Sequence, residues 1–348
     1  MPQEPYTTST NNTQASVTSG GWAILAALRI VLAMIVVAGH WYGLVPGANS
    51  PILQGIANLD GPTAVIAFFL ISGFSIAASV ERGSTAQFAE RRFRRIYPVY
   101  LAGFIPAATL FVLGYTYTAA TTLPYSPLSS VWLTMIGLSC LIVPPMTTYG
   151  VAWSLGCEII YYALAPWLRR IPTLYIVVLL VLSAALNIAF RGHFEWWSQK
   201  VWLIAPGLLC YWLAGWLLYT HRSRPASILT LTIFVLITRS FYTSSMPITL
   251  PISLLIIAVC SRIEVNEPIR LIFNYLGDLS YPLYVIHLSV ILALCGQSSH
   301  WIEDKQWIIA PAILASSLTI LHLVDYPARK HFRLTRSLSS QAETATTA

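Results

Sequence analysis

The sequence predicts an all-α fold: a polytopic membrane helix bundle of about ten transmembrane helices plus one re-entrant or interfacial helix. Hydrophobic residues make up 56% of the 348 residues and charged residues only 9%, whereas about a quarter of the residues in a soluble domain are charged. The mean hydropathy is +0.66. The net charge of +7 is explained by the basic residues that cytoplasmic loops carry, so no nucleic-acid partner is expected.

Eleven apolar runs follow one another along the chain. They cover residues 22–42, 62–80, 97–117, 129–145, 151–168, 173–190, 201–219, 226–241, 246–261, 272–295 and 307–325. If residues 129–145 stay outside as a re-entrant or interfacial helix, fifteen Lys and Arg residues lie on the side of the N-terminus and four on the other. If all eleven runs span, the counts are nine and ten. The positive-inside rule therefore favours ten spans with both termini in the cytoplasm.

The apolar runs define one membrane domain, residues 22–330. Residues 1–21 are expected to be a disordered N-terminal tail and not a cleaved signal, because they lack Lys and Arg. Residues 331–348 are expected to be a disordered cytoplasmic tail. The five cysteines are scattered without a CxxC pair, so we interpret them as small core residues and predict no metal site. The expected location is the cell inner (cytoplasmic) membrane, as a multi-pass protein.

The first apolar run contains Arg29 and, eleven residues later, His40. On a regular helix both side chains share one face about 16 Å apart. An arginine inside a span is costly and normally faces the bundle interior or a wet cavity. Histidine is the side chain that exchanges a proton most easily near neutral pH. The pair predicts a reaction site or a proton path.

Two features flank the turn between the second and third spans. Ser72-Gly73-Phe74 ends the second span and is interpreted as a site of close helix packing. The loop that follows contains Arg91, Arg92, Arg94 and Arg95 before Ile96-Tyr97-Pro98 opens the third span. This cluster is a topology signal, and it is also suited to a polyphosphate ligand because the guanidinium fork matches phosphate.

Further polar residues lie in the later spans. Glu158 is expected in the outer half of its span at a depth comparable with His40, either functional or as the structural partner of an arginine or a tyrosine hydroxyl. Tyr284 and His287 lie one turn apart on one face, and the histidine is either functional or a satisfied packing element. Trp196, Trp197, His300 and Trp301 are candidates for gripping an acceptor or for an interfacial aromatic belt.

The order of these motifs resembles the acyltransferase-3 family of integral membrane O-acyltransferases over about residues 22–330. The motifs are Arg29-x10-His40, Phe69-Leu-Ile-Ser-Gly-Phe74, Arg92-x-x-Arg95-Ile-Tyr-Pro98, Trp153-Ser-Leu155 with Glu158 and Tyr161, and Leu276-Gly277 to His287. The resemblance implies ten core spans, use of acyl-CoA from the cytosolic side, and an acceptor modified at or beyond the outer face.

The resemblance also implies roles for individual residues. Arg29 and His40 are implied to be essential, and Arg92 and Arg95 to serve the donor. We therefore expect His40, Arg29 and Glu158 to be catalytic, and Arg92 and Arg95 to bind the donor. Tyr284 and His287 are expected to bind substrate. No cofactor is expected to be bound permanently, since acetyl-CoA or another acyl-CoA is a substrate. Because no hydrolase-like domain follows Arg336, direct transfer is expected, or else a separate periplasmic or extracellular transferase or glycan-export partner.

The leading hypothesis is an enzyme that moves an acyl group, acetyl first among the candidates, from cytosolic acyl-CoA to a hydroxyl of a glycan or similar acceptor. His40 would act as the base on the hydroxyl or as a nucleophile that carries the acyl group. Arg29 would stabilise the thioester oxyanion or orient His40 through water. The alternative is a secondary transporter or proton-coupled channel with an Arg, His and Glu path, and a structural or sensory protein leaves Arg29 unexplained.

Overall fold

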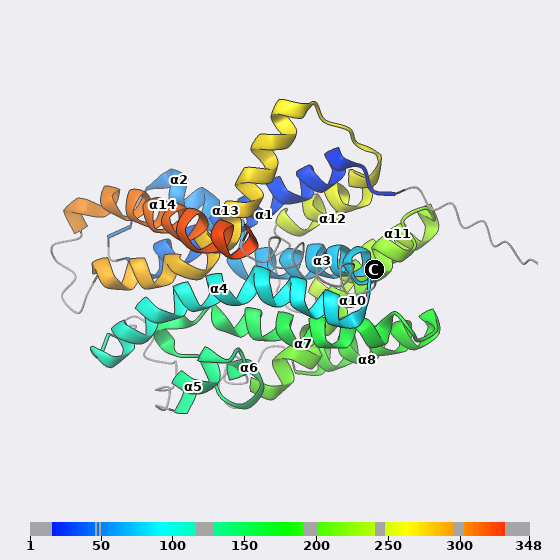
Figure 1. Cartoon of the computed structure of the whole chain (residues 1–348), viewed down its shortest axis with the longest axis horizontal. Helices are drawn as coiled ribbons and strands as arrows, with labels where there is room; N and C mark the ends of the chain where they lie inside the picture. Colours follow the sequence, from blue (N-terminus) through cyan, green and yellow to red (C-terminus); the bar gives the residue numbers. More distant parts are fainter. Residues whose placement is uncertain are drawn as a thin grey trace, which may run out of the picture.

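Every regular element in the described part of the chain is helical, and the helices lie side by side in one bundle (Figure 1). The computed structural model describes residues 16–45, 47–48, 50–115, 129–190, 201–240, 248–295 and 303–330. The helices are α1 (Ser19–Leu44), α2 (Pro51–Ala57), α3 (Gly61–Val80), α4 (Thr85–Val112), α5 (Ser129–Met135), α6 (Ser139–Ile142), α7 (Ala152–Leu168), α8 (Thr173–Ala189), α10 (Ile204–Thr220), α11 (Pro225–Ser240), α12 (Thr249–Val259), α13 (Glu267–Cys295) and α14 (Ile309–Ile320). The predicted all-α membrane bundle is confirmed.

The lengths of the helices separate two groups. By length and composition, five described helices could each cross a membrane: α1, α3, α4, α13 and the continuous helix Gln306–Lys330 that contains α14. Four apolar helices, α8, α10, α11 and α12, are shorter, so a total of ten spans stays a prediction. Residues 129–145 form the short helices α5 and α6 on either side of Gly137, whose φ is +77°. A seven-residue helix is only about 10 Å long, well short of the bilayer core.

Helix α4 begins earlier than the sequence interpretation placed it. The Ser84 hydroxyl accepts a hydrogen bond from the backbone N–H of Gln87, and the Gln87 side chain accepts one from the backbone N–H of Ser84. This reciprocal cap starts the helix at Thr85. The arginine cluster is therefore helical and not a loop, and Pro98 lies inside α4 instead of in its first turn.

Helices α3 and α10 are in backbone contact. A Cβ atom added to Gly73 would lie 1.9 Å from the carbonyl oxygen of Trp212, and one added to Gly215 would lie 2.0 Å from that of Leu70. Each glycine thus removes the side chain that would hold the partner helix away. The interpretation of Ser72-Gly73-Phe74 as a close-packing site is confirmed.

Helices α1 and α13, from distant parts of the chain, also pack closely (Figure 1). At Gly277 an added Cβ atom would lie 2.4 Å from the Cβ atom of Ala26. Helix α1 begins at Ser19, within the predicted tail, because the Thr18 hydroxyl accepts a hydrogen bond from the N–H of Gly21. Residues 1–15 and the predicted tail 331–348 lie outside the described residues.

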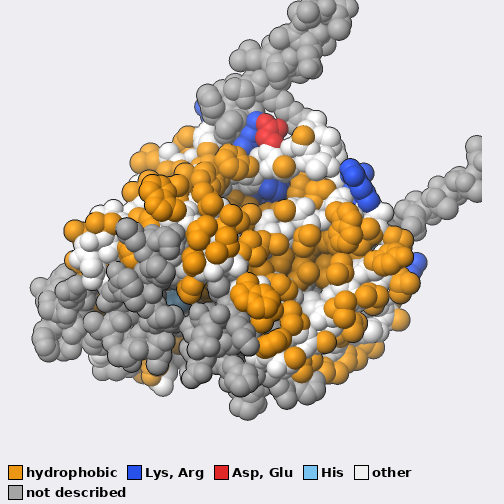
Figure 2. Space-filling view, turned by 90° about the horizontal axis from the view of Figure 1, so that it is seen from below, with side chains coloured by type: hydrophobic (Ala, Val, Ile, Leu, Met, Phe, Trp, Pro, Cys, Tyr) orange, Lys and Arg blue, Asp and Glu red, His pale blue; other side chains and the backbone are white. Residues whose placement is uncertain are grey.

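Many large hydrophobic side chains are exposed on the outside of the bundle. On the face in Figure 2, hydrophobic side chains dominate, and the visible Lys and Arg side chains lie in the upper and right-hand parts. Four cysteines, Cys157, Cys210, Cys260 and Cys295, are buried and free. Arg239, one of the four basic residues counted on the outer side from the sequence, is 1% exposed and pairs with Asp60 at 2.8 Å. Arg239 is buried while the Asp60 side chain is 31% exposed, and the pair ties the end of α11 to the start of α3.

Candidate active site

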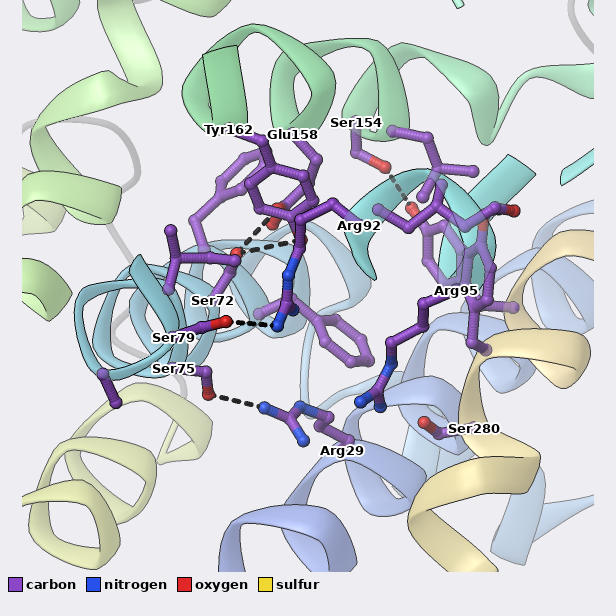
Figure 3. Close-up of a pocket in the computed structure, with 18 of the residues that line it drawn as sticks. Arg29, Ser72, Ser75, Ser79, Arg92, Arg95, Ser154, Glu158, Tyr162 and Ser280 are labelled. Atoms are coloured by element: carbon purple, nitrogen blue, oxygen red, sulfur yellow. Dashed lines mark hydrogen bonds between the residues drawn. The ribbon is translucent and has the colours of Figure 1, made fainter. Parts of the chain in front are cut away.

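A cavity of about 380 Å³ lies between α1, α3, α4, α7 and α13 (Figure 3). Apolar and aromatic side chains form much of its wall, and polar groups converge on its interior. Its charged lining residues are Arg29, Arg82, Arg92, Arg95 and Glu158. Four guanidinium groups against one carboxyl group make the cavity positive, which suits an anionic ligand.

Arg29 enters the cavity from α1. Its Nη2 atom donates a hydrogen bond to the Ser75 hydroxyl at 2.7 Å. A guanidinium group carries five N–H donors, and the structure gives Arg29 no other hydrogen-bond partner among the described residues. Most of its donors therefore remain available to a ligand, and its contacts are separate from those of His40, eleven residues along the helix.

Arg92 and Arg95 enter the cavity from α4. Their three-residue separation puts them on one face of the helix. Arg92 Nη2 donates to the Ser79 hydroxyl at 2.7 Å, and Arg95 extends into the space between Arg29 and Ser280 (Figure 3). The cavity thus receives guanidinium groups from two helices that are far apart in the sequence.

The other two arginines of the cluster do not line this cavity. Arg91 donates to the backbone carbonyl oxygens of Ser79 and Arg82 and so fastens the turn between α3 and α4. Arg94 forms an ion pair with Glu90 one turn earlier on α4. The structure therefore divides the four arginines into two that line the cavity and two that have structural partners.

Glu158 lies with the arginines. Its carboxylate accepts a hydrogen bond from the Ser72 hydroxyl at 2.6 Å, and Ser72 also accepts one from the indole N–H of Trp212 at 3.2 Å. The Tyr162 hydroxyl lies 3.4 Å from that of Ser72 (Figure 3). The expectation that Glu158 lies level with His40 is wrong, because α7 enters the bundle so that Glu158 shares the cavity of Arg29 and Arg92.

Three serines on α3 were missed as site residues by the sequence interpretation. Ser72, Ser75 and Ser79 are spaced by three and four residues and form a polar stripe on an otherwise apolar helix. Each one holds a charged side chain of the cavity. This periodic hydroxyl pattern is a sequence signal that could have identified them.

His40 pairs with His287. The Nδ1 atom of His40 lies 3.0 Å from the Nε2 atom of His287, and the two ring centroids are 5.1 Å apart. The Nδ1 atom of His287 lies 3.2 Å from the carbonyl oxygen of Leu283. His287 is fully buried, and neither histidine lines the arginine cavity.

Tyr284 lies between the cavity and the histidines. It lines the cavity, and its ring centroid is 6.0 Å from that of His287. Its hydroxyl shares a hydrogen bond of 2.6 Å with the Ser154 hydroxyl (Figure 3), and the Phe68 ring packs against it at 5.8 Å. Tyr284 therefore adjoins both regions, and its partners Ser154 and Phe68 line the cavity with it.

Other residues singled out from the sequence fall elsewhere. The Tyr161 hydroxyl donates to the carbonyl oxygen of Ala205 inside the core, so its neighbour Tyr162 is the tyrosine of this pair that faces the cavity. The four proposed acceptor-gripping residues lie outside the described residues: Trp196, Trp197, His300 and Trp301.

Comparison with known proteins adds a family to this geometry. The family model described as "Acyltransferase domain" matches residues 22–324. Acyltransferase MdmB from Streptomyces mycarofaciens is 32% identical over 120 residues, which are 32% of this chain and 29% of that protein. An O-acetyl transferase of Shigella phage Sf6 is 40% identical over 88 residues, 25% of each chain. The chain thus spans less than a third of the length of these relatives, and no solved structure matches it.

Proposed function

This chain belongs to the acyltransferase-3 family, and on that premise we propose that it moves an acyl group from acyl-CoA to a hydroxyl of an acceptor. The observation that carries the proposal is the convergence of Arg29, Arg92 and Arg95 in one cavity. These side chains supply planar N–H pairs that match phosphate oxygens. The donor in this proposal is a CoA thioester because its phosphates need such a site.

The distance between the two polar regions supports the same donor. The separation of eleven positions between Arg29 and His40 on a helix corresponds to about 16 Å. The arm of CoA from its innermost phosphorus atom to its sulfur atom contains about thirteen bonds, which at roughly 1.2 Å per bond of extended chain also extend about 16 Å. A phosphate near Arg29 would therefore place the thioester near His40, with the arm passing Tyr284.

These positions change the role we assign to Arg29. The sequence interpretation gave Arg29 to the thioester oxyanion. Its contact with Ser75 and its place beside Arg92 and Arg95 support a role at the donor phosphates instead. Glu158, which shares that cavity, would limit the positive charge there and keep release of the CoA product possible.

His40 is the group we propose for the chemical step. As a base, it would accept the proton of the acceptor hydroxyl while the oxygen attacks the thioester carbonyl and the C–S bond breaks. As a nucleophile, it would first form an acyl-imidazole with release of the CoA thiol, and the acceptor hydroxyl would then take the acyl group. In the base route the leaving thiolate takes the proton that His40 accepted. In the nucleophile route it takes the proton of the imidazole ring, and the acceptor hydroxyl later returns its own proton to the ring. Each route yields the acyl ester and the CoA thiol, so atoms and charges balance.

Two further elements of the proposal come from outside the geometry. Acetyl is the first acyl group to test, since one relative is named an O-acetyl transferase. A glycan or similar envelope acceptor is proposed on the family resemblance. The orientation we propose puts the arginine end of the bundle at the cytosol of the cell inner membrane, which agrees with the positive-inside rule.

The test is transfer of radiolabel from acetyl-CoA by the purified protein in detergent and in proteoliposomes, with and without a crude glycan fraction. We expect wild type to consume acetyl-CoA and the His40→Ala variant not to. If no label leaves acetyl-CoA and no longer acyl-CoA is consumed either, the proposal is contradicted. Solute flux without acyl-CoA would then favour a transporter.

A further inference from the structure

The two contacts of His287 determine where the protons of the histidine pair lie. The carbonyl oxygen of Leu283 can only accept a hydrogen bond, so the His287 Nδ1 atom, 3.2 Å away, carries the proton. In a neutral imidazole the other nitrogen then holds a lone pair. The His287 Nε2 atom is therefore the acceptor in its 3.0 Å contact with His40 Nδ1.

The same argument then fixes the tautomer of His40. Because His287 Nε2 accepts, His40 Nδ1 must donate, and the lone pair of a neutral His40 lies on Nε2. A neutral pair has no other arrangement of protons that satisfies both contacts. The His40 ring also has the backbone of Val36, one turn earlier on α1, within hydrogen-bonding reach. A carbonyl there can only accept, so in this tautomer it adds to the partners of the Nδ1–H and leaves the lone pair of Nε2 to meet a substrate.

We propose that His287 is a positioning residue that holds His40 in the Nδ1–H tautomer and makes Nε2 its reactive nitrogen. The proposal rests on the proposed function, because both routes of acyl transfer need a ring nitrogen with a free lone pair. In the better-known arrangement a carboxylate orients the catalytic histidine. No carboxylate contacts either ring within the described part of this chain, and a neutral, fully buried histidine takes that place.

The surroundings of His287 suit this task. Its backbone partner Leu283 is one turn earlier on the same helix, so the ring orientation is set by α13 itself. Helix α13 is held against α1 by the close contact of Gly277 with Ala26. The neighbouring Tyr284 hydroxyl is already paired with Ser154 and does not compete for His287.

The first measurement reads the tautomer directly in the full-length protein. Nitrogen-15 solid-state NMR on histidine-labelled wild type, minus the spectrum of His40→Ala, gives the two ring-nitrogen shifts of His40 among the seven histidines. We expect a protonated Nδ1 and an unprotonated Nε2 at neutral pH. A protonated Nε2 in wild type would overturn the proposal without any change to His287.

Two substitutions of His287 then separate positioning from folding. His287→Gln keeps an acceptor oxygen near the place of Nε2, whereas His287→Leu removes it. We expect His287→Leu to shift the proton of His40 toward Nε2. This variant should lower kcat by about ten- to a hundredfold at unchanged KM for acyl-CoA. His287→Gln should keep the Nδ1–H tautomer and most of the rate. Equal kcat in wild type and a folded Leu variant would contradict the proposal.

The NMR result does not depend on any substrate. If wild type consumes no acyl-CoA while His40 shows the expected tautomer, the proposed function fails and the positioning role of His287 for acyl transfer fails with it. If wild type is active but His40 carries its proton on Nε2, only the role of His287 fails. The two failures are therefore distinguishable in one set of samples.

Discussion

The arginine cavity and the histidine pair differ in every property that matters for binding. The cavity is open to a ligand, positive, and built with donors that have few protein partners. The histidine pair has a single proton arrangement when both rings are neutral, and His287 is completely buried. One region is suited to holding charge and the other to placing a lone pair.

On the proposed function, this difference would let one membrane bundle hold a large anionic donor and carry out acyl transfer away from the charge. Charged groups are costly inside a membrane. In this bundle they gather where the serine hydroxyls of α3 form hydrogen bonds with them. The nitrogen proposed to react lies about three helical turns away on α1, next to His287. Substitutions in the two regions should therefore give opposite kinetic signatures.

The largest expected effect is on the histidine side. His40→Ala should lower kcat by about a thousandfold or more, because the base or nucleophile is lost. Binding of CoA, measured by calorimetry, should stay within about twofold, since no cavity residue changes. If CoA binding were lost together with activity, the separation of the two regions would be wrong.

The second effect belongs to the cavity. Arg92→Ala and Arg95→Ala should each raise the KM for acyl-CoA by about ten- to a hundredfold, because each removes charge-assisted hydrogen bonds to phosphate. Arg94→Ala is the matched control, since it lies on the same helix and pairs with Glu90 outside the cavity. An equally large effect in the control would show that general charge, and not the cavity, determines donor binding.

A smaller effect tests the assignment of Glu158. Gln at this position keeps the shape and an acceptor for Ser72 but removes the negative charge. We expect Glu158→Gln to tighten CoA binding by about two- to tenfold, because a carboxylate beside bound phosphates repels them. A loss of kcat as large as that of His40→Ala, with unchanged CoA binding, would move Glu158 to the chemical step.

The smallest effect is expected at Tyr284 and Ser154, where the cavity adjoins the histidine pair. Tyr284→Phe and Ser154→Ala each remove the 2.6 Å hydrogen bond between α13 and α7, and each should cost about 0.5–1.5 kcal/mol of stability. The Ser154 hydroxyl also donates to the carbonyl oxygen of Val151. The double variant loses no bond beyond those lost in Ser154→Ala, so it should be about as stable as Ser154→Ala alone. Additive losses, measured by thermal unfolding in detergent, would show that the two hydroxyls act independently.

The residues that the sequence identified are those whose type is improbable in a membrane. Arg29, Glu158 and the arginines of α4 stand out because charge is rare in apolar runs, and the structure brings Arg29, Arg92, Arg95 and Glu158 into one cavity. The cap at Ser84 and Gln87 was also readable from the sequence. It was overlooked because a dense charge cluster was interpreted as a loop.

The contacts between distant helices could not be predicted in the same way. Helical periodicity places His40 and His287 each on a face of its own helix, but it contains no information on how α1 and α13 pair. The predicted depth of Glu158 was wrong for the same reason, because it was counted along its own helix, α7, alone. The close approach of α3 and α10 was predictable only in part, because Gly73 indicates a near neighbour without identifying it.

The pairing of α1 with α13 also has a consequence for biosynthesis. His40 and His287 are 247 residues apart in the chain, so at about 5–20 residues per second the ribosome adds the second about 12–50 s after the first. During that interval the nascent protein contains His40 without the residue that orients it. On the proposed mechanism, full turnover of acyl-CoA therefore begins only when the penultimate long helix has joined the first.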